Sequence, residues 1–316
     1  MNVKILVCYH KKDELYKNDI LIPIHCGRAV GKIASKDGSV QAKDFEWCLE
    51  NLIGDDSGEN ISELNREVNE MSAIYWAWKN YDKIGNPDYI GLCHYRRLFN
   101  FSNQGNFTKC TNLLEQLNIN SKSINDILSN NEFVCRKPVR TNEMLKKCAE
   151  AFQKIIKFSD EKYPNLYNSY EEYMNGNEYF CNSMFIMSKE DFFEYCATIF
   201  PIMFEFLNNE NRRIEFIKYI NMLLSAKELK RFKGGEVWLD RITGFFMEYV
   251  SNYFFIYLQK KRKTYMASVI NTEADIKITN SKSILKNIFS VTNSADGRKK
   301  IIKIFGVCII INKKGV

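Results

Sequence analysis

The sequence of 316 residues lacks the patterns that mark most metal and redox sites. Its three histidines, His10, His25 and His94, disfavour a histidine-rich metal site. Its ten cysteines are scattered without any C-x-x-C pair. That scatter argues against a zinc ribbon or a redox motif and for reduced thiols in the cytosol.

Long apolar runs are also missing. No stretch approaches the roughly 18 apolar residues that would cross a bilayer. The run Met1–Val7 is too short for a secretory signal. We therefore expect a cytoplasmic protein, and its hydrophobic and charged fractions, 45% and 26%, are typical of a soluble globular chain.

Basic charge is concentrated near the C-terminal end. Residues 260–316 hold thirteen Lys or Arg against three Asp or Glu, a net charge of +10, whereas the whole chain carries +7 and residues 1–259 therefore −3. We predict a folded domain over 1–259 and a basic tail over 260–316. Apolar residues of a predicted short helix, 283–291, and of the run 301–311 indicate attachment to an anionic membrane surface, or a hairpin about Gly306 that packs on the domain.

Strands and helices alternate along the domain and predict an α/β fold with a mostly parallel sheet. Short apolar runs predict strands at 3–9, 20–24, 89–93, 132–135 and 179–187. Helical spacing of apolar residues predicts helices at 63–82, 110–131, 141–158, 191–207, 212–230 and 236–258, with a loop at 163–178. Ser62 and Ser188 are the expected N-caps of two of these helices.

The end of strand 89–93 is the most informative segment, because His94, Arg96 and Arg97 follow it directly. Ligands of open α/β sheets bind at the carboxyl ends of strands. Planar guanidinium groups bind phosphate through paired hydrogen bonds, so the segment suits a phosphate-bearing ligand. A solvated arginine pair beside a core histidine is the alternative.

Three blocks of the sequence resemble, in order, those of a bacterial family. They are Gly54–Ser62 (GDDSGENIS), Ile74–Asn80 (IYWAWKN) and Gly91–Arg97 (GLCHYRR). The family is the "domain of unknown function 4422" family of capsular and exopolysaccharide glycosyltransferases, and the resemblance covers residues 3–258. The segment Asn69–Ser72 (NEMS) departs from the Glu-Leu-Thr-like segment expected there, and a second lysine, Lys12, follows His10.

The resemblance implies a GT-A-like, Rossmann-type mixed sheet flanked by helices, with a nucleotide-diphospho-sugar over its carboxyl edge. Typical enzymes of this fold bind a divalent cation through an Asp-x-Asp motif, where this chain has a His-Tyr-Arg-Arg segment. Cations must offset the negative charge of a departing nucleoside diphosphate. We therefore predict transfer without a metal, with Arg96 and Arg97 as electrophilic stabilisers and His94 as a hydrogen-bond donor. The alternative is Mn²⁺ or Mg²⁺ held by Asp55 or Asp56.

The resemblance also implies residues that bind the nucleotide or the donor sugar. They are Tyr9, His10, Lys11, Asp55, Asp56, Asn60, Tyr95, Asn182 and Arg241. The acids and Asn60 are equally typical of a turn and a helix cap. For the pair Asn182-Ser183, a β-bulge is the simpler account.

An inverting reaction needs a carboxylate that deprotonates the acceptor hydroxyl. Arg241, Gly244 and Glu248 fall on one face of the predicted last helix, next to Asp240, and resemble the family's closing Arg-x-x-Gly-x-x-x-Glu pattern. Glu248 or Asp240 is the predicted base. A structural pair between Arg241 and Glu248 is the alternative.

The predicted function is a glycosyltransferase that moves a sugar to a growing capsular, exopolysaccharide or lipopolysaccharide acceptor. The predicted donor is a UDP-hexose, for which UDP-galactofuranose is one candidate, and no further cofactor is expected. The expected partners are this donor, a lipid-linked or oligosaccharide acceptor and the inner face of the cell membrane, but no nucleic acid. A sugar-phosphate transferase and a non-catalytic subunit of a polysaccharide assembly complex are the alternatives.

The basic tail leads to a first prediction. At low salt the full chain should sediment with vesicles that contain anionic lipid, because each basic residue near such a surface contributes about 1 kcal/mol. Added salt should release it through screening. Neutral phosphatidylcholine vesicles serve as the control, and equal behaviour with both vesicle types would contradict attachment through the tail.

Overall fold

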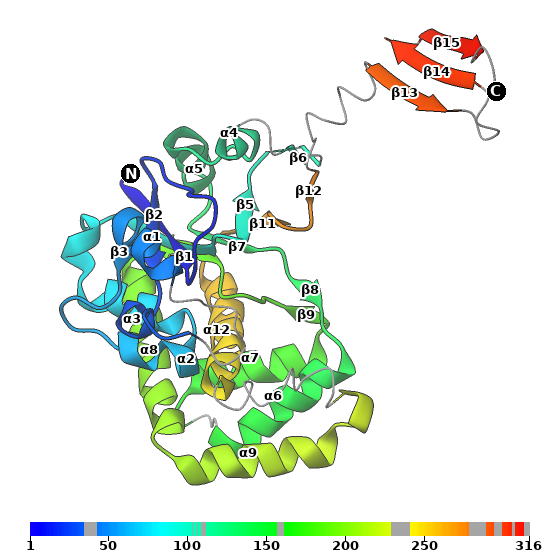
Figure 1. Cartoon of the computed structure of the whole chain (residues 1–316). Helices are drawn as coiled ribbons and strands as arrows, with labels where there is room; N and C mark the ends of the chain where they lie inside the picture. Colours follow the sequence, from blue (N-terminus) through cyan, green and yellow to red (C-terminus); the bar gives the residue numbers. More distant parts are fainter. Residues whose placement is uncertain are drawn as a thin grey trace.

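An eight-stranded sheet lies at the centre of the chain, with helices on both of its faces (Figure 1). The computed structural model describes residues 1–34, 43–102, 104–105, 107–108, 112–156, 161–228, 241–277, 289–293, 299–304 and 307–312. The predicted mixed α/β sheet flanked by helices is confirmed.

The N-terminal half of the sheet is parallel. Its strands are β1 (Val3–Tyr9), β2 (Leu21–His25), β3 (Ile53–Gly54) and β4 (Tyr89–His94). β1 lies between β2 and β4, and β3 forms the edge beside β2. Ile5 and Val7 of β1 face one hydrophobic core, whereas Leu6 and Cys8 face the other. A strand buried on both faces needs the unbroken apolar run that predicted it.

The other half of the sheet is mixed. Its strands are β5 (Arg97–Asn100), β7 (Phe133–Arg136), β10 (Phe185–Ser188) and β11 (Thr264–Asn271). The strand order is β10-β7-β11-β5-β4-β1-β2-β3, and β10 also pairs with β4. The expected mostly parallel sheet is wrong in this half, because β5 follows β4 through a two-residue hairpin turn and not through a crossover helix.

Helices cover the two faces unequally. One face carries α1 (Asp44–Asn51), α4 (Leu113–Gln116) and α5 (Ser121–Leu128). The other carries a thicker layer of α6 (Glu143–Ile156), α7 (Pro164–Asn175), α8 (Lys189–Leu207), α9 (Glu210–Leu223) and α12 (Ile242–Lys261). Fourteen of the twenty residues of α12 are buried, as its all-round apolar sequence requires. No helix within the described ranges has the length and apolarity that crossing a bilayer requires.

Several predicted elements differ from the structure, and the helix expected over 110–131 is divided into α4 and α5. The expected helix over 63–82 is broken into η2 (Ser62–Leu64), α2 (Asn65–Val68), α3 (Met71–Lys79) and η3 (Tyr81–Ile84). The apolar spacing continues through these pieces, so the sequence pattern does not reveal the breaks. The expected loop at 163–178 contains α7, which begins with Pro164 at a position where a missing N–H is harmless. The N-cap at Ser188 is confirmed, since its Oγ accepts a hydrogen bond from the Asp191 N–H.

The predicted domain boundary at residue 260 is wrong, because β11 lies between β5 and β7 in the central sheet. The body continues to β12 (Ile276–Lys277), which pairs with β6 (Phe107–Thr108). Beyond it, β13 (Phe289–Asn293), β14 (Lys299–Ile304) and β15 (Val307–Asn312) form an antiparallel sheet, in the described part paired only with one another (Figure 1). The helix expected over 283–291 is wrong at 289–291, and 283–288 lie outside the described residues.

Gly91, in the middle of β4, leads to a prediction about the sheet. A Cβ at this position would lie 2.8 Å from the backbone oxygen of Phe185 and 2.9 Å from Cγ1 of Ile186, both in β10. Because backbone cannot move aside easily, Gly91→Ala should lower the free energy of unfolding by about 1–3 kcal/mol. Denaturant unfolding measures this change. Gly105→Ala is the matched control, since nothing lies within 4 Å of its added Cβ, and equal effects in the two variants would contradict the packing account.

Candidate active site

The hairpin turn after β4 forms the centre of the candidate site. His94 and Arg97 are paired across this turn, so their side chains project from the same face, while Tyr95 and Arg96 occupy the turn itself. His94 Nε2 lies 2.9 Å from the backbone oxygen of Asn182 and donates to it, since a carbonyl oxygen only accepts. Burial, assisted by Arg97, lowers the pKa of His94 and keeps its ring neutral at neutral pH.

A second turn, from a distant part of the chain, faces His94. Asn182 and Ser183 both have positive φ, 66° and 46°, which is uncommon for residues other than glycine. Arg136, the last residue of β7, donates to Oδ1 of Asn182. The turn separates β9 (Glu178–Tyr179), which pairs with β8 (Val139–Arg140), from β10. Asn182 and Ser183 therefore form a turn between two strands and not a bulge within one strand.

Two carboxylates lie beside this second turn. Glu248, on α12, accepts a hydrogen bond from the Tyr179 hydroxyl at 3.4 Å. Burial and the neighbouring charge of Glu70 raise the pKa of Glu248 to about 7. Burial also raises the pKa of Glu70, while Arg241 and Arg97 oppose that rise. A carboxyl group with a pKa near 7 is suited to take a proton at neutral pH.

Glu70 reaches this place because the helical path is interrupted between α2 and α3. Asn69, at the break, has φ 53° and ψ −134°, a conformation that costs a non-glycine residue about 1–3 kcal/mol. Its backbone oxygen accepts from Asn65 Nδ2 at 2.7 Å, and its side-chain oxygen accepts from Arg241 Nε at 3.0 Å. Gly244 leaves space for Asn69, since an added Cβ would overlap the Asn69 side-chain amide.

The three residues predicted to share one face of the last helix therefore have two different roles. Arg241 and Gly244 hold Asn69, and Glu248 lies one turn further along α12, at the site. Arg241 donates to Asn69, and within the described residues it forms no ion pair with Glu248, so the alternative structural pair is not formed. Asp240, the second candidate base, lies outside the described residues.

His10, which follows β1, lies next to the hairpin turn. Its Nε2 is 3.3 Å from the Tyr95 hydroxyl. Burial, together with the charges of Arg96 and Arg241, lowers the pKa of His10 to about 3. His10 is therefore neutral and lies on the same side as these arginines. Lys11, beside it, is partly exposed.

The two adjacent arginines have different surroundings. Arg96 lies over the ring of Tyr95, 5.1 Å from its centroid, and pairs with Glu273 at 2.9 Å. Arg97 lies near Glu70 and Glu248. Its side chain forms no hydrogen bond or ion pair with any part of the chain that the structure describes. Of these two arginines, Arg97 is the one whose side chain is available to a ligand.

Tyr9 and Tyr95 form the wall behind His10. Their rings are stacked, with centroids 5.1 Å apart, and both are buried. The Tyr9 hydroxyl donates to the backbone oxygen of Glu14 and accepts from the N–H of Tyr16. Tyr9, expected at the nucleotide, is thus engaged with the segment that follows β1.

Asp55 is fully buried, with no exposed side-chain area. Its Oδ1 accepts from the Arg28 N–H and the Ser62 hydroxyl, and its Oδ2 accepts from the Gly27 N–H and the Ser72 hydroxyl. With two hydrogen bonds on each oxygen, the carboxylate has its acceptor positions filled. Of the two alternatives for Asp55, ligand binding and a turn, its contacts are those of a turn residue. It joins the segment after β2 to η2 and α3.

Asp56 and Asn60 lie near Asp55 in sequence but outside this network. Asp56 is exposed. The Asn60 side chain accepts from the Ser62 N–H at 3.1 Å and donates to the Gly58 backbone oxygen at 2.9 Å, as a turn residue does. Over the described ranges, no three or more His, Cys, Asp or Glu side chains gather in a way that would hold a metal ion.

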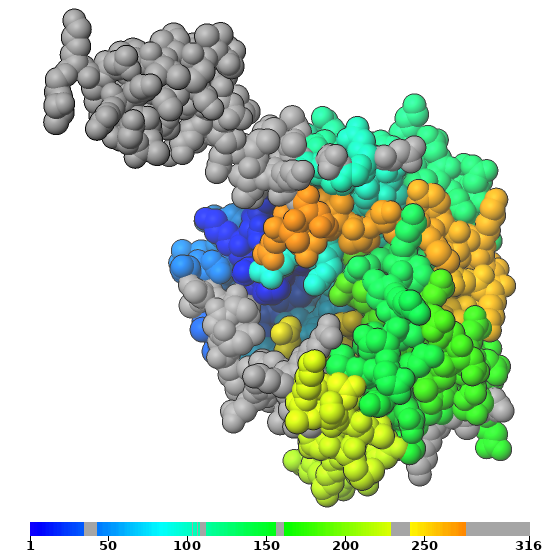
Figure 2. Space-filling model, turned by 90° about the vertical axis from the view of Figure 1, so that its right-hand side faces the viewer, coloured from blue at the N-terminus to red at the C-terminus, as the bar shows by residue number. Residues whose placement is uncertain are grey.

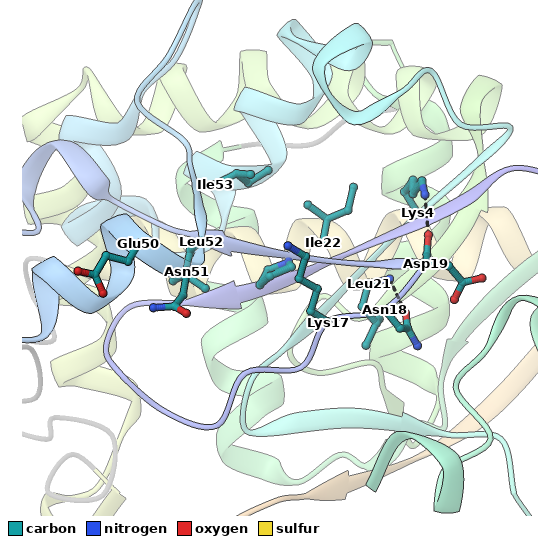
Figure 3. Close-up of a pocket in the computed structure, with 11 residues that line it drawn as sticks. Lys4, Lys17, Asn18, Asp19, Leu21, Ile22, Glu50, Asn51, Leu52 and Ile53 are labelled. Atoms are coloured by element: carbon teal, nitrogen blue, oxygen red, sulfur yellow. Dashed lines mark hydrogen bonds between the residues drawn. The ribbon is translucent and has the colours of Figure 1, made fainter. Parts of the chain in front are cut away.

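The surface is hollowed where these segments meet. Figure 2 shows a recess between the N-terminal segments (blue) and the middle of the chain (green), with atoms of α12 (gold) inside it. A separate hollow of about 320 Å³ lies near the start of β1, where Lys4 donates to the backbone oxygen of Asp19 (Figure 3). The partly buried charges Glu70, Glu248 and Arg97 gather at the other end of β1, so we take the recess as the candidate active site.

Comparisons with known proteins agree with this fold. The chain belongs to the family described as "Domain of unknown function (DUF4422)", whose model matches residues 4–222. No curated protein matches the chain. Among solved structures, the apo structure of WbbM, a bifunctional glycosyltransferase, matches with a TM-score of 0.60 and 21% identity, over 89% of this chain and 46% of that chain. The chain thus spans about half the length of WbbM, and this likeness shows a shared fold.

Sequence reasoning missed Glu70 and Arg136. Glu70 fell within a predicted continuous helix, where a charged residue is typical of a solvated face. Arg136 followed a predicted strand as Arg97 did, but no motif surrounded it. The available signal for Glu70 was the departure of its segment, Asn69–Ser72, from the expected family pattern.

Proposed function

We propose that this protein transfers a sugar from a nucleotide-diphospho-sugar to a hydroxyl group of a growing capsular, exopolysaccharide or lipopolysaccharide acceptor. One observation carries the proposal: Arg97 and Glu248, whose pKa is about 7, lie near one another at the carboxyl end of β4. A fixed cation stabilises a departing diphosphate, and such a carboxylate accepts the proton of an attacking hydroxyl. The fold shared with the bifunctional glycosyltransferase WbbM supports this reaction class.

The proposed reaction is a single displacement. Glu248 takes the proton of the acceptor hydroxyl, and the acceptor oxygen attacks the anomeric carbon of the donor sugar. The bond from that carbon to the diphosphate breaks, and its electron pair stays on the phosphate oxygen. Arg97 stabilises the negative charge that develops there. The product has the opposite anomeric configuration to the donor.

Arginine side chains perform in this proposal the charge neutralisation that a divalent cation performs elsewhere. Arg97 and Arg241 lie on the same side of the site as Glu70. Arg96 extends this basic surface once a phosphate displaces Glu273. In this proposal His10 and Lys11, at the end of β1, bind the nucleotide. We propose a UDP-hexose donor, with UDP-galactofuranose among the first to test.

The deciding experiment incubates the pure protein with a panel of nucleotide sugars and an oligosaccharide acceptor. Release of the nucleoside diphosphate together with an acceptor heavier by one sugar residue is the expected result. Phosphorus in the product would indicate sugar-phosphate transfer instead. Donor binding without any turnover would indicate a binding subunit.

The different surroundings of the two arginines lead to a prediction. Arg97→Ala should lower kcat/KM by on the order of a hundredfold, because it removes a charge that stabilises the transition state. Arg97→Lys should recover part of the loss, since lysine retains the charge but not the planar fork. Arg96→Ala is the matched comparison, with a smaller loss because Glu273 already neutralises Arg96. Near-normal turnover in Arg97→Ala would exclude the role.

Removal of divalent cations gives a further prediction. Transfer should persist in excess EDTA, because fixed guanidinium groups supply the positive charge. The measurement compares initial rates before and after chelation, and again after Mn²⁺ or Mg²⁺ is restored. Loss with EDTA and recovery with metal would contradict the scheme, and Asp56 would become the first ligand to test.

A further inference from the structure

We propose that Glu70 is a positioning residue of the transfer site, which acts through Glu248 and which α12 directs to its place through Arg241 and Gly244. This inference rests on the proposed function and goes beyond it. Glu70 belongs to none of the sequence blocks that pointed to the site. It is nevertheless a partly buried carboxylate that faces the catalytic groups.

The placement of Glu70 depends on the break at Asn69. A continuous helix over 63–82 would make residue 70 an ordinary mid-helix position. The positive φ of Asn69 ends α2, so Glu70 instead precedes the first residue of α3. The burial of its carboxyl group follows from this change of direction.

The N-cap residue of α12 and one residue of its first turn hold Asn69, and with it the interruption between α2 and α3, in place. Arg241 Nε donates to the Asn69 side chain at 3.0 Å, and Gly244 provides the space that this side chain occupies. The same helix carries Glu248 one turn later. The spacing Arg-x-x-Gly-x-x-x-Glu thus has a geometric meaning: its first two members hold the segment that presents Glu70, and its last member is the proposed base.

The charges around the two carboxylates are mixed. The groups that face Glu248 are Glu70, His94, Arg97, Tyr179 and the Asn182 backbone. The groups that face Glu70 are Arg241, Arg97, Ser183 and the thiols of Cys8 and Cys26. Burial is the first cause of the raised pKa of Glu248, and the charge of Glu70 is the second. If Glu70 loses its charge, Glu248 becomes a weaker base and Arg97 keeps one carboxylate neighbour.

The sign of the effect on stability follows from the same shifts. The pKa of Glu248 in the folded chain, about 7, is above its usual 4.5, and that of Glu70 is raised as well. A raised carboxyl pKa means that the folded state holds protons more tightly than the unfolded state, so stability falls as pH rises through this window. Glu70→Gln and Glu248→Gln should therefore melt at a higher temperature than wild type at pH 8. A glutamate with a purely structural ion pair would give the opposite result.

The test compares Glu70→Gln with Glu67→Gln, three residues earlier in the chain, where Glu67 pairs with Arg213 away from the site. Protein without substrate is labelled with ¹³C at the glutamate carboxyl groups, and the Glu248 signal is identified by its absence in Glu248→Gln. In Glu70→Gln the titration midpoint of Glu248 should fall by at least about half a pH unit. In Glu67→Gln it should not move.

Activity supplies the second readout. In wild type, kcat/KM should fall about tenfold per pH unit below the pKa of Glu248. In Glu70→Gln this acid limb should move to lower pH, with kcat reduced and the donor KM little changed. Gly244→Ala should give a similar shift without removing a charge, because it displaces Asn69.

The outcomes separate the two proposals. A Glu248 midpoint unchanged in Glu70→Gln overturns the role of Glu70, and so does a wild-type pH profile in a Glu70→Gln enzyme that turns over donor. A shifted midpoint in a protein that transfers no sugar supports the pairing of the two carboxylates and overturns the proposed function alone.

Discussion

The carboxylate of Asp55 is the contact on which the candidate site most depends. It is buried, and it accepts hydrogen bonds from the N–H groups of Gly27 and Arg28 and from the hydroxyls of Ser62 and Ser72. It therefore ties the segment after β2 to η2 and to the first turn of α3. Without this carboxylate, the N–H groups of Gly27 and Arg28 and the Ser62 hydroxyl would lose their acceptor, a loss of about 1–3 kcal/mol for each group left unsatisfied.

The hydrogen-bond network continues from Asp55 to Arg241 at the start of α12. Ser72 also bonds with Asn65 and Asn69, and Asn69 bonds in turn with Arg241 of α12. Gly27 and Gly244 lie directly against this network, where any side chain would overlap Asn65 or Asn69. The network thus joins three segments, the one after β2, residues 55–72 and the start of α12, by contacts that tolerate little change in volume.

Strain and buried charge are concentrated in the same region. Asn69, Asn182 and Ser183 have positive φ, and all three lie next to Glu70 or Glu248. Backbone strain of this kind persists only where the surroundings hold it, and it occurs frequently at functional sites. Charged carboxylates that are kept from water also lower stability at neutral pH. The sheet and the apolar helix α12 supply the stability that these features reduce.

The sequence by itself determined the strands β1, β2, β4 and β7, the N-cap at Ser188, the family, and His94 and Arg97 as candidates, because apolar runs, caps and motifs are local signals. Only the tertiary structure decided that β5 turns back from β4, which separates the environments of Arg96 and Arg97. It also decided that Asp55 belongs to the fold and that the helix breaks at Asn69 to present Glu70. These outcomes depend on contacts between residues far apart in the chain, such as Arg241 with Asn69, which no local pattern encodes.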